Sequence, residues 1–384
     1  MTRADAHLPK GVRAKPEILD HVRGDLSTPL GAVKLAESRR NCDFAATMTP
    51  AIFGIAGLEL GTEERAFFAD ADPAGYIIFG RNVASREQLR QLTDQLRAIH
   101  GRERLLITID QEGGRVQRMK PPVWPAYPAG AAFDALYDIA PASAIEAARV
   151  NAQALGLDLA EVGITCTHAP VLDVRQPGAN DVIGDRAMGH EPLRVAALGR
   201  AVLDGLARAG VVGTIKHMPG HGRTHCDTHK AMPTVTASEA ELELDLAPFK
   251  ALNYALTGMT GHLLFTAWDK VNPATQSPFI IEQIIRRRIG FDGLLFTDDL
   301  DMEALSGTVP ERAECSVAAG CDLALNCWAK MPDMIGICER LPVMGEAATV
   351  RLDRALAGMS PAGDVAEQAV LLAKRDALLG LVSA

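Results

Sequence analysis

The densest group of chemically active side chains lies in the stretch 216–229, which reads Lys-His-Met-Pro-Gly-His-Gly-Arg-Thr-His-Cys-Asp-Thr-His. Its four histidines recur at every fourth residue: His217, His221, His225 and His229. On a helix this spacing would build one metal-binding face. Pro219, Gly220 and Gly222 argue against a helix and indicate a loop. A zinc site of a metal-dependent barrel hydrolase stays open as an alternative, but the interpretation we favour has no metal.

The same loop offers an acid–base pair. Asp227 and His229 are two residues apart, and in an extended segment side chains at this spacing project to the same side. A carboxylate placed there can orient an imidazole and stabilise its cationic form, and histidine suits proton transfer near neutral pH. The loop therefore indicates a general acid–base group, His229, supported by Asp227.

Further polar side chains follow short apolar runs elsewhere in the chain. They are Asp110, Gln111 and Glu112 after Leu105–Ile109, Asp173 after Pro170–Val171, Lys216 and His217 after Val211–Ile215, Asp298 and Asp299 after Leu294–Thr297, and His262 within Gly258–Phe265. A single carboxylate at such a place often caps the next helix, as Asp298 or Asp299 would. Capping does not explain why lysine and histidine also follow these runs, so a shared site is the better interpretation.

The elements that must position these residues alternate regularly. Eight short β-rich runs are bounded by Gly, Pro or polar residues: Ala51–Ile55, Gly75–Phe79, Leu105–Ile109, Gly163–Thr167, Val211–Ile215, Gly258–Phe265, Leu294–Thr297 and Asp322–Leu325. Helical patterns lie between them: Thr62–Phe68, Ser85–His100, Ser143–Leu157, Glu191–Ala209, Ser238–Leu256, Glu282–Ile289 and Pro310–Ala319. Ser85 with Gln88, and Ser238 with Glu241, have the spacing of capping boxes.

This alternation predicts an α/β protein with parallel strands. Eight repeats close most simply into a (β/α)8 TIM barrel, whose catalytic residues sit at the C-terminal ends of the strands. The alternative is an open doubly wound sheet, which usually carries a G-x-G-x-x-G turn after its first strand; Gly54 and Gly57 do not form one. We expect one barrel domain over residues 48–384, including a C-terminal helix at Asp364–Leu381.

The N-terminal 47 residues differ from the rest. Met1–Arg40 is interrupted by Pro and Gly and has no apolar segment typical of a signal peptide. We interpret residues 1–47 as a weakly ordered extension. Met48 stands directly before the first strand, so a natural start at Met48 is the alternative.

The composition of the chain limits the kinds of binding partner and the cellular compartment that we expect. The 384 residues carry 39 basic and 48 acidic side chains, a net charge of −9, which argues against nucleic acid or an anionic membrane as the main partner. The seven cysteines form no C-x-x-C pair, as in proteins of a reducing compartment. No apolar run reaches the ~20 residues of a membrane helix. We therefore expect a cytoplasmic protein.

Four motifs together resemble glycoside hydrolase family 3. They are Asp-Gln-Glu-Gly-Gly-Arg-Val-Gln-Arg at 110–118, Gly-Asp-Arg-Ala at 184–187, Lys-His-x-Pro-Gly-His-Gly at 216–222 and Gly-x-x-Phe-Thr-Asp-Asp-Leu-x-Met at 293–302. Their order and residues resemble the cytoplasmic single-domain β-N-acetylglucosaminidases of peptidoglycan recycling. The resemblance runs from about Ala51 to the mid-300s and implies a TIM barrel.

The resemblance also implies a role for each site residue. Asp298 would be the nucleophile that forms a glycosyl-enzyme intermediate, and His229 the acid/base, with Asp227 as its partner. Five residues would line the subsite for N-acetylglucosamine (GlcNAc): Asp110, Arg118, Arg186, Lys216 and His217. Asp299 and Asp301 would start a helix or support the nucleophile, and His221 and His225 would only shape the loop. Met188 and Met218 stand where the family commonly carries Phe, so the pocket shape is expected to shift.

The implied enzyme is an exo-acting retaining hydrolase that needs no metal or organic cofactor. It would release terminal β-1,4-linked GlcNAc from peptidoglycan fragments, namely GlcNAc–anhydroMurNAc with or without peptide, and would act as a monomer on this small-molecule substrate. Alternatives within the family are a β-N-acetylglucosaminide phosphorylase and a β-glucosidase. A non-enzymatic sugar-binding protein is a further alternative, although binding alone needs no aligned nucleophile and acid.

Overall fold

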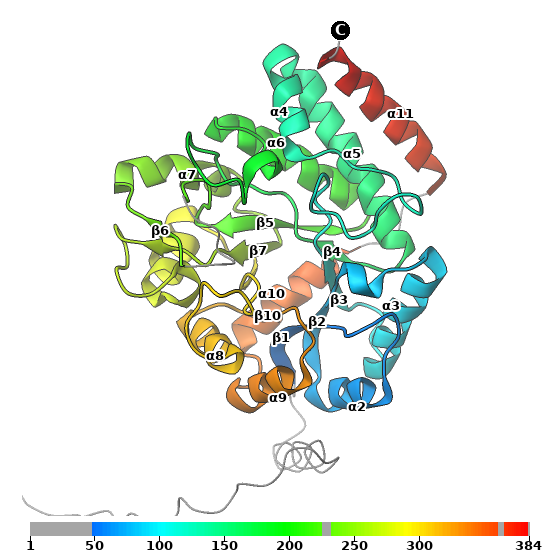
Figure 1. Cartoon of the computed structure of the whole chain (residues 1–384), viewed down its shortest axis with the longest axis vertical. Helices are drawn as coiled ribbons and strands as arrows, with labels where there is room; N and C mark the ends of the chain where they lie inside the picture. Colours follow the sequence, from blue (N-terminus) through cyan, green and yellow to red (C-terminus); the bar gives the residue numbers. More distant parts are fainter. Residues whose placement is uncertain (1–47, 225–231, 360–364, 383–384) are drawn as a thin grey trace, which may run out of the picture. The chain divides into compact units, whose positions relative to one another are not determined.

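Eight parallel strands form a nearly closed ring at the centre of the computed structural model, which describes residues 48–224, 232–359 and 365–382 (Figure 1). The hydrogen-bonded order is β10-β1-β2-β3-β4-β5-β7-β9. The strands are β1 (Thr49–Gly54), β2 (Pro73–Ile78), β3 (Leu106–Ile109), β4 (Cys166–Thr167), β5 (Val212–Met218), β7 (Thr257–Thr260), β9 (Leu294–Phe296) and β10 (Ala324–Asn326). The expected (β/α)8 barrel is therefore confirmed over the doubly wound sheet.

The ring closes between β9 and the residues that lead into β10. Phe296 and Leu323 form an isolated parallel bridge, and the Asp322 amide donates to the Leu295 carbonyl at 2.7 Å. The next link uses a side chain, because the Leu325 amide donates to Thr297 Oγ1 at 2.9 Å. Side-chain and backbone bonds together thus bring the ends of β9 and β10 side by side.

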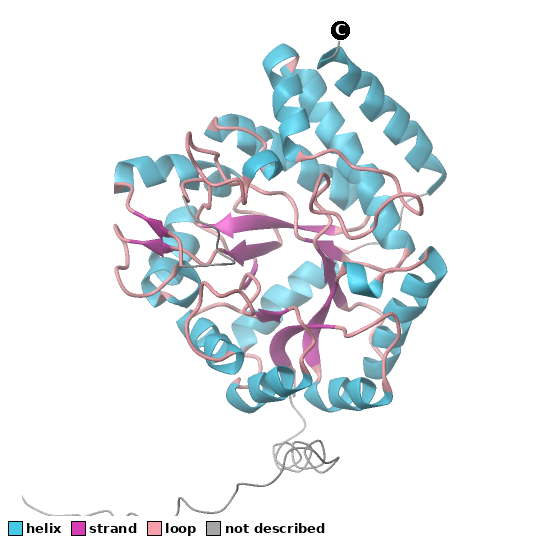
Figure 2. Cartoon of the chain, in the orientation of Figure 1, coloured by secondary structure: helices cyan, strands magenta, loops and turns pink. Residues whose placement is uncertain are grey.

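Helices surround the ring of strands (Figure 2). They are α2 (Thr62–Ala71), α3 (Arg86–His100), α4 (Gly130–Ile139), α5 (Pro141–Glu161), α6 (Pro192–Arg208), α7 (Glu239–Ala251), the π-type helix η4 (Ile280–Ile289), α8 (Val309–Ala319), α9 (Met331–Arg340), α10 (Glu346–Ala357) and α11 (Gln368–Leu379). Capping residues mark the N-termini of several of these helices. Ser238 and Glu241 form the predicted capping box of α7. At α3 only half of the box forms, because Gln88 Oε1 accepts from the Ala84 amide instead.

Some elements differ from the sequence expectations. The run Gly258–Phe265 divides into β7 and a short strand β8 (Leu264–Phe265), which pairs outside the ring with β6 (Thr234–Val235). The chain turns between them, where the Leu263 amide donates to the Gly261 carbonyl. Neither Asp298 nor Asp299 caps the next helix, since Thr308 is the N-cap of α8. Helices α4, α9 and α10 were not expected.

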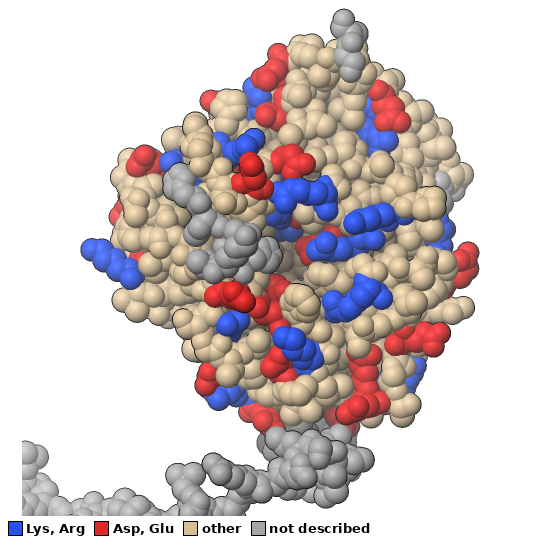
Figure 3. Space-filling model, in the orientation of Figure 1, with Lys and Arg blue, Asp and Glu red and all other residues tan. Residues whose placement is uncertain are grey.

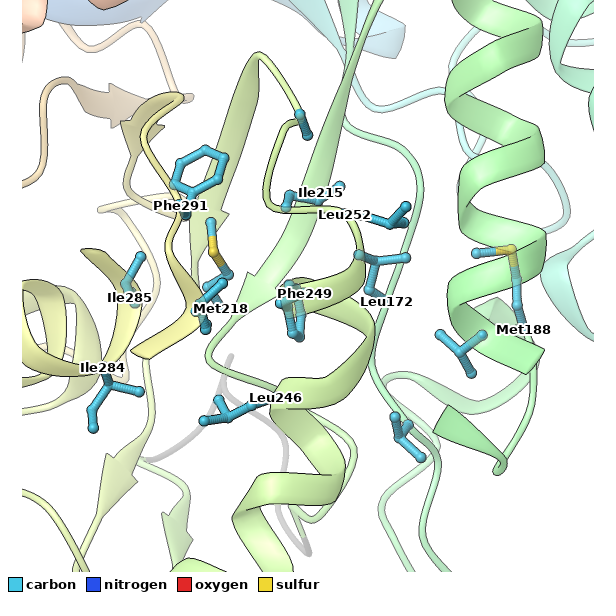
Figure 4. Packing of buried hydrophobic residues seen from close by; sticks show 14 of the residues in the cluster. Leu172, Met188, Ile215, Met218, Leu246, Phe249, Leu252, Ile284, Ile285 and Phe291 are labelled. Carbon is cyan, nitrogen blue, oxygen red and sulfur yellow. The ribbon is translucent and has the colours of Figure 1, made fainter. Parts of the chain in front are cut away.

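A large buried cluster joins β5 to the helices beside it (Figure 4). Met218 and Met188 belong to this cluster and are 0% and 4% exposed. Met218 is not in the wall of the cavity at the C-terminal ends of the strands, whose volume is about 220 Å³, and Met188 borders a smaller cavity instead. The expected effect of these two residues on the pocket is therefore indirect, through packing of the core behind it.

The predicted C-terminal helix is confirmed as α11, which packs on α5. Arg375 donates to Asn151 Oδ1 at 3.2 Å and Gln368 donates to the Ala154 carbonyl at 3.2 Å. All described residues belong to one compact unit, Cys42–Ala384, and the expectations for residues 1–47 lie outside the described residues. In the described parts of the chain, every helix is too short or too polar to cross a membrane.

Candidate active site

The C-terminal ends of the strands surround one cavity of about 220 Å³. In Figure 3, basic and acidic side chains gather around a hollow near the centre of the face shown. Six of the predicted site residues line the cavity: Asp110, Arg118, Arg186, Lys216, His217 and Asp298. The predicted acid/base pair, Asp227 and His229, lies outside the described residues.

Asp110 follows β3 and accepts hydrogen bonds from three side chains. Its Oδ1 lies 3.1 Å from His168 Nδ1 and 3.4 Å from Lys216 Nζ, and its Oδ2 lies 3.0 Å from Arg118 Nη2. Burial alone would raise the pKa of Asp110, but the charge of Lys216 and the bond from His168 hold it well below its usual range. Asp110 is therefore a fixed carboxylate that can accept hydrogen bonds from sugar hydroxyls.

Glu112 holds two cations against the cavity wall. It accepts a bidentate pair of hydrogen bonds from Arg186, both at 2.8 Å, and its Oε1 lies 2.6 Å from Lys216 Nζ. Burial would raise its pKa, but Arg186 and Lys216 lower it to about 2. Lys216 is 2% exposed and lies between Glu112 and Asp110. This arrangement compensates a buried ammonium and fixes its direction.

Asp173 anchors the turn that follows β5. Its Oδ2 lies 2.7 Å from His217 Nδ1, and its Oδ1 accepts from the backbone amides of His217 at 3.2 Å and His221 at 2.7 Å. Burial opposes ionisation, but these partners bring the pKa of Asp173 down to about 2. Burial lowers the pKa of His221 to about 4, so this imidazole is neutral at pH 7. His221, expected only to shape the loop, also borders the cavity.

The loop that carries the predicted acid/base starts from a tightly packed turn. A Cβ on Gly222 would collide with the carbonyl of Val174, and the Gly222 carbonyl accepts from the Gln176 amide at 3.0 Å. Arg223 extends to Asp245 at 2.5 Å. Glycine at 222 thus permits a close backbone approach that fixes the base of the loop.

Asp298, the predicted nucleophile, is a half-buried carboxylate in the cavity wall. Its Oδ1 accepts from the Asp299 amide at 2.8 Å. Burial would raise its pKa, yet the nearby imidazoles of His217 and His262 outweigh burial, and the pKa of Asp298 is lowered. An ionised oxygen that faces a small polar cavity meets the requirement for a nucleophile.

The neighbouring carboxyl groups have a different environment. Burial, followed by repulsion from Asp301 and then Asp298, raises the pKa of Asp299 to about 7. Asp301 Oδ2 accepts from Asn326 Nδ2 at 2.7 Å and from the Cys327 amide at 3.3 Å. Asp301 therefore links the segment after β9 to the end of β10. The expectation that Asp301 starts a helix is wrong, because the next helix begins at Val309; its expected support of Asp298 stays a prediction.

Sequence reasoning missed one contributor and left others, among them Glu112 and Asp173, without a role. His168 follows β4, is 0% exposed and borders the cavity, and nothing in its local sequence distinguished it. Glu112 and Asp173 were recognised as polar residues after apolar runs, but their partners come from other strands. Only closure of the barrel reveals that Glu112 pairs with Lys216 and that Asp173 holds His217.

The structure offers no metal cluster in its described part. Within residues 48–224, 232–359 and 365–382, no three His, Cys, Asp or Glu side chains are grouped so that they could hold a metal ion. His225 and His229 lie outside these ranges, so the zinc alternative is not tested.

Residues 47–356 match the family model described as the glycosyl hydrolase family 3 N-terminal domain. The chain is 37% identical over 311 residues to a beta-hexosaminidase of Alkalilimnicola ehrlichii, covering 79% of this chain and 88% of the relative. It is similar to the crystal structure of NagZ from Neisseria gonorrhoeae in complex with N-trifluoroacetyl-D-glucosamine, with a TM-score of 0.77, 33% identity, and coverage of 88% of this chain and 99% of that chain. It is also similar to the structure of a glycoside hydrolase family 3 β-N-acetylglucosaminidase from Paenibacillus sp., with a TM-score of 0.72 and 33% identity. That match covers 87% of this chain and 62% of the other chain. The chain therefore belongs to glycosyl hydrolase family 3, among its β-hexosaminidases.

Proposed function

We propose that the chain is a retaining exo-β-N-acetylglucosaminidase of the cytoplasm. Its substrates are peptidoglycan fragments, GlcNAc–anhydroMurNAc with or without peptide, from which it releases the terminal β-1,4-linked GlcNAc. The observation that carries the proposal is the ionised Asp298 in a cavity of about 220 Å³ whose wall also holds the ordered charges of Asp110, Arg118 and Lys216. The NagZ structure with a bound N-acylglucosamine supports the choice of sugar.

The reaction proceeds in two displacements. In the first, Asp298 attacks the anomeric carbon, a carboxylate–sugar ester bond forms, and the glycosidic bond breaks while His229 gives its proton to the leaving oxygen. In the second, His229 takes a proton from water, the water oxygen attacks the anomeric carbon, and Asp298 is released. Asp227 orients the His229 imidazole throughout. Neither displacement needs a metal or an organic cofactor.

The remaining charged groups position the sugar. Asp110 accepts hydrogen bonds from ring hydroxyls, and Lys216, Arg118 and Arg186 donate to ring oxygens. Because these cations are already paired with Asp110 or Glu112, a sugar meets groups whose direction is set before it binds. His217, oriented by its bond to Asp173, contributes a further polar contact.

The state of the cysteines supports the proposed compartment. Five of them lie in the described parts of the chain and all five are free thiols: Cys166, Cys315, Cys321, Cys327 and Cys338. Free thiols are typical of a reducing compartment such as the cytoplasm.

The first test compares hydrolysis of an aryl β-GlcNAc glycoside with that of the corresponding aryl β-glucoside. We expect a clear preference for the GlcNAc substrate; preference for the glucoside would contradict the proposal.

Asp298→Ala should abolish turnover without loss of the fold measured by circular dichroism. Asp94→Ala, which removes an exposed carboxylate on α3, is the matched control. Product analysis in phosphate buffer distinguishes hydrolysis from phosphorolysis, because only the phosphorylase yields GlcNAc 1-phosphate.

A second test concerns the covalent step. A 5-fluoro β-GlcNAc fluoride should add one sugar to the protein, and peptide mass spectrometry should locate it on Asp298. If the substrate's own acetamido group were the nucleophile, no adduct would accumulate, and an N-trifluoroacetyl substrate would react far more slowly than the N-acetyl one. That combination would refute the role of Asp298 while keeping the β-N-acetylglucosaminidase activity.

A further inference from the structure

A large aromatic side chain stands exposed beside the cavity. Trp328 is 61% exposed and directly follows Cys327, which is buried and lines the cavity wall. The strand β10 ends at Asn326, so Trp328 lies at the same end of the barrel as Asp298. Indole rings are mostly buried in folded proteins, and one exposed at a strand end next to a site is a candidate contact for a ligand.

The surroundings hold Trp328 in a defined position. Lys330 Nζ lies 5.8 Å from the centre of the indole ring and 3.6 Å from Asp301 Oδ1. Asp301 is in turn bonded to Asn326 at the end of β10. Between the Trp and Lys residues, Ala329 has a φ of 55°, which residues with a side chain adopt rarely. Such backbone conformations tend to be retained where function requires them.

The cavity is small compared with a disaccharide substrate. Its volume is about 220 Å³, whereas pockets that enclose drug-sized ligands run from about 300 to 1,000 Å³. We therefore expect one ring of a disaccharide to occupy the cavity and the leaving ring to lie at its mouth. Just beyond the end of β10, next to Cys327 in the cavity wall, the exposed Trp328 has a flat apolar face, and the side chain of Lys330, 59% exposed, carries a positive charge.

We propose that Trp328 and Lys330 bind the leaving sugar: the indole packs against one face of its ring, and the ammonium group pairs with a carboxylate that the sugar carries. The ligand class is an N-acetylated sugar with an acidic substituent. This inference rests on the proposed function, because it concerns the aglycone of the same reaction. Arg81 strengthens the positive character of this region, since it is exposed and donates to the carbonyls of Ile55 and Cys327.

Three substrates separate the contributions. β-GlcNAc fluoride has a one-atom leaving group, N,N′-diacetylchitobiose has a neutral leaving sugar, and GlcNAc–anhydroMurNAc has an acidic one. We expect Trp328→Ala to lower kcat/KM about tenfold for both disaccharides and less than about twofold for the fluoride. Lys330→Gln should lower kcat/KM about fivefold for the acidic disaccharide alone, and added salt should reduce this difference, because exposed charges are screened.

Two control variants make the same kinds of substitution away from the cavity. Tyr254→Ala removes an aromatic side chain of similar exposure, 57%, just before β7 at the opposite end of the barrel, and Lys374→Gln removes an exposed ion-paired lysine on α11. Both should leave all three rates within about twofold. Equal losses on all three substrates, or no loss on the disaccharides, would overturn the inference. If Trp328→Ala fails to fold, Trp328→Phe, which keeps a ring, should retain most of the wild-type kcat/KM for both disaccharides; a drop as large as the one expected for Trp328→Ala would refute the stacking role. Absence of activity on every GlcNAc glycoside in the wild-type protein would instead refute the proposed function.

Discussion

Asp173 provides the sharpest test of how the site is held together, because one fully buried carboxylate accepts three hydrogen bonds. In Asp173→Asn, the amide oxygen can still accept from the amides of His217 and His221, but the charge and the bond to the His217 ring are lost. Hydrogen bonds to charged groups contribute about 1.5–3 kcal/mol, and removing one partner of a buried pair costs about 3–5 kcal/mol. We expect the variant to lose about 3 kcal/mol of unfolding free energy at pH 7.

The lowered pKa of Asp173 expresses the same contacts as a dependence of stability on pH. A carboxyl group whose pKa is about 2 in the folded protein and 3.8 when unperturbed stabilises the fold by roughly 2 kcal/mol at neutral pH. Because the folded pKa is the lower one, this stabilisation is complete above pH 3.8 and is lost as the pH falls through 2. The difference between wild type and variant should therefore fall to about half at pH 3.

Urea unfolding of both proteins at pH 7 and pH 3, followed by circular dichroism, measures this difference directly. Asp185→Asn is the control, since its carboxylate pairs with Arg115 at an exposed position and should change stability by less than about 1 kcal/mol. A loss below about 1 kcal/mol in Asp173→Asn, or a loss that is the same at both pH values, would refute the reasoning. The aryl-GlcNAc assay should also show a reduced kcat/KM, because His217 loses its anchor.

Three further results are expected. Glu112→Gln leaves Lys216 and Arg186 without their shared carboxylate, so urea unfolding should show a loss of about 3–5 kcal/mol and the KM for aryl GlcNAc should rise; an unchanged KM would contradict the positioning role. Leu246→Ala opens a cavity in the large core cluster and should cost about 2–5 kcal/mol in the same unfolding assay, while kcat/KM of the folded fraction stays normal. His229→Ala should reduce the hydrolysis of GlcNAc–anhydroMurNAc far more than that of an activated aryl glycoside, which needs little protonation; equal losses would count against His229 as the acid.

The sequence predicts the barrel well because its information is local and repeated. Each buried strand is a short apolar run, as at Leu294–Thr297, and the polar residue that follows it marks the catalytic end. The run Gly258–Phe265 was wrongly predicted to be one strand, because apolar composition alone does not reveal that the chain turns at Gly261. Helix α4 escaped prediction because its ten residues are mostly apolar, and only Asp134 and Asp138, four residues apart, mark a polar face.

The site is predictable in its members but not in its pairings. Asp110 and Asp298 stand out because each is charged and follows a strand, and Lys216 stands out because it is a charged residue at the end of an apolar run, although β5 continues to Met218. The sequence does not reveal that Lys216 lies between Asp110 and Glu112, since that depends on where β3 and β5 lie in the ring. The buried ring of His168 is harder still, because a single histidine after a short strand gives no signal until the fold brings it to Asp110.

The link through Asp301 has a consequence for how such enzymes diversify. It ties the segment that carries Asp298 to the end of β10, while the groups proposed to hold the sugar come from β5, from the residues after β3 and from the short helix Gly184–Arg186. The roles proposed for Trp328 and Lys330 place selectivity for the leaving sugar in the short segment 328–330, and Lys330 is also paired with Asp301. On this proposal, substitutions at Trp328 would change which leaving sugar is accepted without altering the carboxylates and cations of the cavity, so related enzymes should vary at this position sooner than at those groups.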